Sequence, residues 1–74
     1  MTLGERVKKL RHELHMSQQE LAIRMGYSSG SSINKIEKGR PVTQKIIVRL
    51  ADALHTTPSY LMGWDDEKTV TVEV

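Results

Sequence analysis

The sequence predicts one all-α domain of five short helices, residues 1–64, followed by a short tail, residues 65–74. Apolar residues recur at steps of three and four positions as far as residue 63, which is the spacing of amphipathic helices. Each periodic stretch is preceded by Ser or Thr or followed by Gly, the residue types that cap helices. The chain has 74 residues, which is enough for a single domain.

The first helix is predicted to run from about Leu3 to Leu14. Its apolar stripe consists of Leu3, Val7, Leu10 and Leu14. Thr2 and Glu5 have the spacing of a capping box, in which each side chain bonds the backbone N–H of the other residue. The helix therefore has both a defined start and one face suited to a core.

The second and third helices are predicted to form a pair joined by a tight turn. Ser17 and Glu20 form another capping box, and Gly26 ends the second helix in a left-handed conformation. Ser29 is the predicted N-cap of the third helix, which runs to about Lys38. The predicted inward residues of the pair are Leu21, Ala22, Met25, Ile33 and Ile36.

The fourth and fifth helices complete the predicted domain. Thr43 caps the fourth helix, whose apolar residues are expected to close the core. These residues are Ile46, Ile47, Leu50, Ala51 and Leu54. Thr57 followed by Pro58 begins a short fifth helix, since proline is favoured in the first turn, and Gly63 ends it.

The tail differs from the body in both charge and periodicity. Residues 65–67 are acidic, and residues 69–74 alternate apolar and polar positions, which indicates a strand. A strand has no partner in an all-α body. Three states are therefore open for the tail: pairing with the same strand of a second copy, the start of a linker, or disorder.

Charge and composition narrow the class of protein. The net charge of +2 combines a body of +5 over residues 1–63 with a tail of −3 over residues 64–74. A small basic body suits a polyanionic partner. Absence of cysteine excludes disulfides and thiolate metal sites. No apolar run approaches the roughly 20 residues of a membrane span, and residues 1–5 do not resemble a signal peptide, so we expect a cytoplasmic protein.

The outward side of the third helix predicts contact with DNA bases. A helix that reads the major groove needs hydrogen-bonding groups in its N-terminal half and an apolar face toward the domain. The predicted base-contacting residues are Gly30, Ser31, Asn34 and Lys35. Asn pairs with adenine and Lys donates to guanine, whereas a glycine permits close approach of the backbone.

Phosphate contacts are predicted on both sides of that helix. The start of the second helix has free N–H groups that favour an anion, and basic residues follow the third helix. The predicted phosphate-contacting residues are Ser17, Gln18, Ser29, Lys38, Arg40 and Lys45. Spacing and composition alone also fit an ordinary helical hairpin with a solvated polar face.

The chain resembles the lambda-repressor-like, Cro/CI-type (XRE family) helix-turn-helix domains. The matching segments are Met16–Ala22, Gly26, Ser32–Arg40, Leu50–Leu54 and Tyr60–Gly63. They cover about residues 3–64, and their combination is specific. The resemblance implies a compact five-helix domain and a sequence-specific regulator that binds double-stranded DNA.

Carried over by position, the resemblance assigns individual roles. It implies that Gln18 binds phosphate, that residues 30, 31 and 35 read bases, and that Arg11 and Glu37 form a buried structural ion pair. The chain departs from the family pattern at residues 27–30, where the turn is about one residue longer and glycine replaces a longer reader. Base reading is therefore expected to depend on Lys35, Asn34 and Ser31, with a larger share left to DNA shape and to bridging water.

Two other kinds of site are not predicted. His12 and His15 are three residues apart but have no further metal ligand near them in the sequence, so we interpret them as solvated and expect no metal and no cofactor. The serines lie in no Gly-x-Ser-x-Gly nucleophile turn, and no base is arranged around them. The chain is therefore not expected to be an enzyme.

The resulting hypothesis is a phage or bacterial repressor that acts as a homodimer on a two-fold operator in the cytoplasm of the host, near the nucleoid. Candidate dimer residues are Tyr60, Leu61 and Trp64, which alternatively cap the monomer core. Two functional alternatives remain: an antitoxin-type autoregulator that also binds a toxin, and an interaction module that has lost DNA binding. A further domain after Val74, or another protein partner, is also compatible with the sequence.

Overall fold

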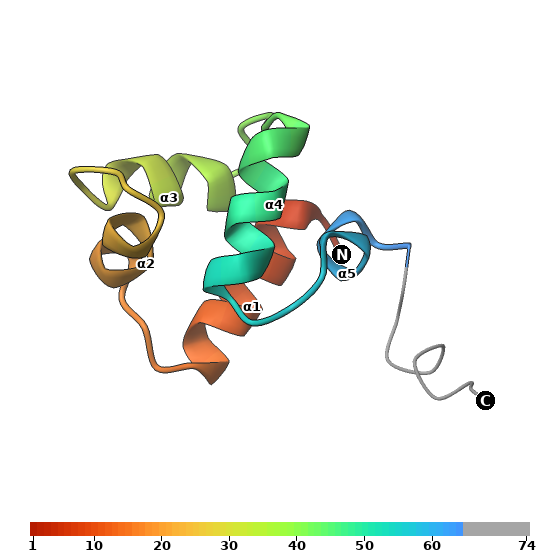
Figure 1. The fold of residues 1–74 in the computed structure, drawn as a ribbon, viewed down its shortest axis with the longest axis horizontal. Helices are drawn as coiled ribbons and strands as arrows, with labels where there is room; N and C mark the ends of the chain where they lie inside the picture. The colour runs from red at the N-terminus through yellow and green to blue at the C-terminus, as the bar shows by residue number, and fades with distance from the viewer. Residues whose placement is uncertain (65–74) are drawn as a thin grey trace.

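The computed structural model describes residues 1–64, which form five helices (Figure 1). These are α1 (Leu3–Glu13), α2 (Gln18–Arg24), α3 (Ser31–Glu37), α4 (Gln44–Ala53) and α5 (Pro58–Met62). Residues 1–64 contain no strand, so the predicted all-α architecture is confirmed for this part of the chain. The predicted strand and the other states considered for the tail lie outside the described residues.

The five helices surround one small core. Figure 1 shows α2 and α3 together at one end of the molecule, α5 at the other end, and α4 between them. Helix α1 contacts both α3 and α5, so it connects the two ends. Each helix contributes at least one large side chain that is almost completely buried. These side chains are Val7, Leu21, Ile33, Leu50 and Leu61.

Local capping explains where the helices begin. The side chains of Thr2, Ser17, Thr43 and Thr57 each accept a hydrogen bond from the backbone N–H three residues later. Both predicted capping boxes are present. In the first, the hydrogen bond that the backbone N–H of Thr2 donates to Glu5 holds the pKa of that carboxyl below its ordinary value.

The helix ends share one backbone motif. Within residues 1–64, every helix is followed by a residue of positive φ, and the next N–H bonds a carbonyl five residues back, at 2.9 or 3.0 Å. Three of these residues are glycines, which adopt this conformation without strain. The other two are His15 and His55, both with φ 57°. Their helices therefore end with a left-handed residue that carries a side chain.

One predicted core position is wrong. Leu14 does not continue the apolar stripe of α1, because the helix ends at Glu13 and Leu14 is its C-cap. The backbone turns away at His15, so Leu14 remains exposed. Met16 takes the buried place beyond the end of α1 and packs with the core residues of the other helices.

Candidate nucleic-acid interface

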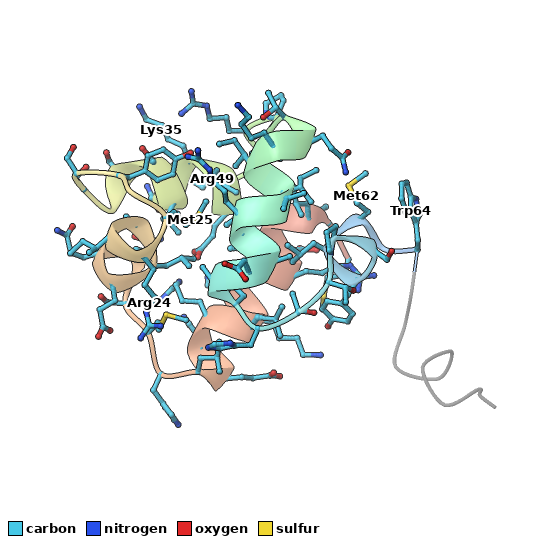
Figure 2. The ribbon with its side chains drawn as sticks, in the orientation of Figure 1. Arg24, Met25, Lys35, Arg49, Met62 and Trp64 are labelled. Carbon is cyan, nitrogen blue, oxygen red and sulfur yellow. The ribbon has the colours of Figure 1, made fainter. Side chains whose placement is uncertain are left out.

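The exposed face of α3 carries three of the predicted DNA-contacting residues. Ser31, Lys35 and Lys38 are exposed and lie four and three positions apart, so they share one side of the helix. Figure 2 shows Lys35 pointing away from the body of the domain. Ile33 and Ile36 are buried on the opposite side. Helix α3 is thus docked by an apolar face and presents hydroxyl and ammonium groups outward.

The start of α3 differs from the prediction. Ser29 is not the N-cap; Gly30 occupies that position and makes no side-chain cap. The N–H of Gly30 donates to Gln19 Oε1 at 2.9 Å, and an ideal Cβ on Gly30 would lie 2.9 Å from the backbone nitrogen of Gln19. The turn therefore passes against α2 before α3 begins, which only a residue without a side chain permits.

This packing changes what residues 29 and 30 can offer to DNA. A side chain at position 30 would point into α2, so Gly30 presents no group on the outward face of α3. Ser29 remains exposed, and its Oγ lies 2.9 Å from the Oγ of Ser31. The two hydroxyls therefore form a small polar pair at the start of the exposed face.

Helix α3 is fixed to α1 by a buried ion pair. Arg11 Nε donates to Glu37 Oε2 at 2.7 Å, and Arg11 NH2 donates to Glu37 Oε1 at 3.2 Å. The two side chains are only 9% and 5% exposed. Arg11 NH1 also donates to the carbonyl oxygen of Met16 at 2.8 Å. Because the guanidinium is bidentate, the pair fixes both distance and orientation between the helices.

Gln18 extends this network from α2. Its Nε2 donates to Glu37 Oε1 at 3.1 Å and to Asn34 Oδ1 at 3.3 Å. Both hydrogens of the Gln18 amide are thus used within the protein. The predicted phosphate contact therefore cannot come from this side-chain amide as the structure has it, and only the backbone N–H of Gln18 is left for that role.

Ser17 is only partly used by the fold, because its hydroxyl oxygen caps α2 while its O–H hydrogen can still be donated to a phosphate. Its hydroxyl accepts from the N–H of Glu20 at 3.0 Å, and its own N–H donates to Glu20 Oε1 at 2.9 Å. Three other predicted phosphate-contacting residues lie at the surface. Lys38, Arg40 and Lys45 are exposed and lie at the end of α3, in the following loop and in the first turn of α4.

Gly4 is a positioning residue that the sequence analysis did not identify. An ideal Cβ there would lie 2.6 Å from the carbonyl oxygens of both Ile36 and Glu37. The first turn of α1 thus approaches the end of α3 closely enough to exclude any side chain. An isolated glycine within a helical pattern was the available signal, since such glycines often have a packing reason.

The candidate dimer residues divide into three environments. Leu61 is 1% exposed and belongs to the monomer core, so its predicted place in a contact surface is wrong. Tyr60 is half-buried, with the Arg6 guanidinium 5.1 Å from its ring centre. Trp64 is 70% exposed and Met62 37%. Figure 2 shows Met62 and Trp64 at the α5 end of the molecule, away from Lys35.

Residues 1–64 contain no cluster of three His, Cys, Asp or Glu side chains that could hold a metal ion. His12 Nε2 instead lies 3.1 Å from Arg11 NH2, and His15 lies in the turn after α1. In the same part of the chain, no helix has the length and apolar character needed to cross a membrane.

Comparison with known proteins agrees with this geometry. A family model described as helix-turn-helix matches residues 7–61, from α1 into α5. A search of curated proteins finds no match to the chain. The matched region includes both helices of the α2–α3 pair and the ion pair that holds it. The chain belongs to the XRE family of Cro/CI-like helix-turn-helix proteins, which are DNA-binding transcription regulators.

Proposed function

We propose that this protein is a sequence-specific repressor that inserts α3 into the major groove of double-stranded DNA. The observation that carries the proposal is the exposed face formed by Ser31, Lys35 and Lys38 on a helix fixed from behind by buried residues. Side chains that donate hydrogen bonds from such a face can reach guanine O6 and N7. Rigid support matters because base reading depends on the position of a few atoms.

Phosphate contacts on either side of α3 hold the helix in register. Lys38, Arg40 and Lys45 provide exposed positive charge near the end of α3 and the start of α4. The backbone N–H groups in the first turn of α2 provide neutral donors on the other side. Contacts of this kind bind all sequences and set the orientation in which the base contacts are made.

The protein acts as a homodimer on a two-fold operator, with half-sites about one helical turn apart. The exposed apolar side chains Met62 and Trp64 favour self-association through the α5 end, because a tryptophan that is 70% exposed gains by burial. Bound to a promoter in the bacterial cytoplasm, the dimer would block transcription by occupying the site.

The test is selection of binding sites from random duplex DNA, followed by affinity measurements at several salt concentrations. The proposal expects a two-fold sequence motif and an affinity that falls steeply with salt, because phosphate contacts release counterions. A protein-interaction module would bind no duplex in a salt-dependent way. Co-purification of a small toxin protein together with a DNA motif would instead identify an antitoxin-type autoregulator.

A further inference from the structure

We propose that Gln18 and the buried ion pair orient the side-chain amide of Asn34, so that its NH2 group is the part offered to the DNA bases. This inference rests on the proposed function, because it assigns the specificity of the same α3 surface. Gln18 then acts as a positioning residue for Asn34 instead of binding phosphate through its side chain.

The direction of the hydrogen bonds follows from the charge of Glu37. A carboxylate paired with an arginine is ionised and only accepts hydrogen bonds. Arg11 donates to both of its oxygens, at 2.7 and 3.2 Å. The Gln18 atom that lies 3.1 Å from Glu37 Oε1 must therefore be the NH2 nitrogen and not the carbonyl oxygen.

The same reasoning gives the orientation of the side-chain amide of Asn34. Gln18 Nε2 also lies 3.3 Å from the Asn34 side chain, and a nitrogen that donates requires an acceptor opposite. The Asn34 atom facing α2 is therefore Oδ1. In residues 1–64 no acceptor contacts Asn34 Nδ2, which leaves both of its hydrogens for a ligand.

Asn34 is well placed to donate its two Nδ2 hydrogens to a DNA base. It is half-buried beside the exposed face of α3, three residues after Ser31 and directly before Lys35. Asparagine in general pairs with adenine through both amide atoms. Here the oxygen is held toward α2 by Gln18, so the outward group is a donor. Guanine and thymine present only acceptors to such a donor in the major groove, whereas the acceptor N7 of adenine lies beside the N6 donor, so guanine and thymine are the expected matches.

The experiment compares base preferences of full-length variants on sites selected by the wild-type protein. Gln18→Ala and Asn34→Ala should both lose preference at the same base pair of each half-site, by on the order of tenfold. The double variant should lose no more than either single variant. In the Asn34→Asp variant the outward group becomes an acceptor, so preference at that base pair should move toward cytosine, whose N4 is a donor.

Gln44→Ala is the matched control, because Gln44 is an exposed glutamine that holds the same first position in α4. It should leave every base preference unchanged. The inference is overturned if Gln18→Ala weakens all sequences alike, or if Asn34→Ala changes no preference at all. Circular dichroism shows whether each variant is folded.

A measurement on the free protein separates this inference from the proposed function. Nuclear magnetic resonance should show slow solvent exchange of the Gln18 side-chain NH2 and fast exchange of the Asn34 and Gln44 groups. Fast exchange of the Gln18 NH2 would show that it does not donate to Glu37 and Asn34, and would overturn the inferred orientation of both amides. If Gln18 is protected but the wild-type protein selects no DNA sequence, the orientation stands, whereas the proposed function and the reading role of Asn34 both fail.

Discussion

The carboxylate of Glu37 receives two hydrogen bonds from the guanidinium of Arg11, at 2.7 and 3.2 Å, and thereby joins α3 to α1. Glu37 is the last residue of α3, whereas Arg11 lies in the last turn of α1. The pair therefore helps to fix the orientation of α3 relative to α1. Since the base contacts that we propose come from the exposed side of α3, this interior interaction would control the position of the proposed reading surface.

Glu37→Gln should destabilise the fold strongly, because it leaves the Arg11 charge buried without a partner. Breaking one side of a buried pair costs about 3–5 kcal/mol, which is a large part of the stability of a small domain. Urea unfolding followed by circular dichroism measures the change. Glu13→Gln, at an exposed position at the end of α1, is the control and should have little effect. A loss below about 1 kcal/mol for Glu37→Gln would contradict the structural role.

Gly4→Ala should destabilise the protein although alanine favours helices. In an open helix the change would add roughly 1 kcal/mol of stability. Here the new Cβ would lie 2.6 Å from two backbone carbonyl oxygens of α3, so one helix must move, at a cost of about 1–3 kcal/mol. Thermal unfolding should show a lower Tm, whereas Lys8→Ala, exposed on the same helix, should not. A higher Tm for Gly4→Ala would show that α1 and α3 are less closely packed.

His15→Gly and His55→Gly should each stabilise the protein. Both histidines have φ 57°, a conformation that costs a residue with a side chain roughly 1–2 kcal/mol. Glycine removes that strain but makes the unfolded chain more flexible, which leaves a net gain of about 0.5–1 kcal/mol. His12→Gly, within α1, is the matched control and should destabilise instead. Equal losses of stability in all three variants would show that the positive φ of His15 and His55 is not strained.

Trp64→Lys should weaken self-association without unfolding the monomer, because the tryptophan is 70% exposed. Analytical ultracentrifugation at several concentrations measures the monomer–dimer equilibrium. Ile23→Lys changes another exposed apolar residue, on α2 (60% exposed), and should leave the equilibrium unchanged. Dimers that persist in Trp64→Lys would place the contact surface elsewhere.

The sequence predicted those features that depend on neighbouring residues. The capping boxes of Thr2 and Ser17 and the left-handed Gly26 were predicted because each depends on a few adjacent positions. Leu14 and Leu61 were misassigned for a different reason. Apolar spacing gives the face on which a residue lies, but not whether the backbone has already turned away, or which neighbour covers that face.

The hydrogen bonds that hold α3 to α1 and α2 could not be predicted from neighbouring residues either. The Arg11–Glu37 pair was expected only through resemblance, since the two residues are 26 positions apart. The hydrogen bonds from Gln18 to Asn34 and Glu37 depend on how α2 crosses α3, which periodicity does not determine. Likewise, the shift of the N-cap from Ser29 to Gly30 follows from contact with Gln19 in another helix.

The central claim is that the exposed face of α3 reads DNA sequence. It is tested most directly by comparing site selection by the wild-type protein with Lys35→Ala, using Lys38→Ala as the control for a phosphate contact. The wild-type protein should select a two-fold motif. The Lys35→Ala variant should lose about 1–3 kcal/mol of discrimination at one or two base pairs of each half-site. Lys38→Ala should weaken all sequences evenly and reduce the salt dependence. An equal loss on every sequence for Lys35→Ala, or no motif for the wild type, would contradict the claim.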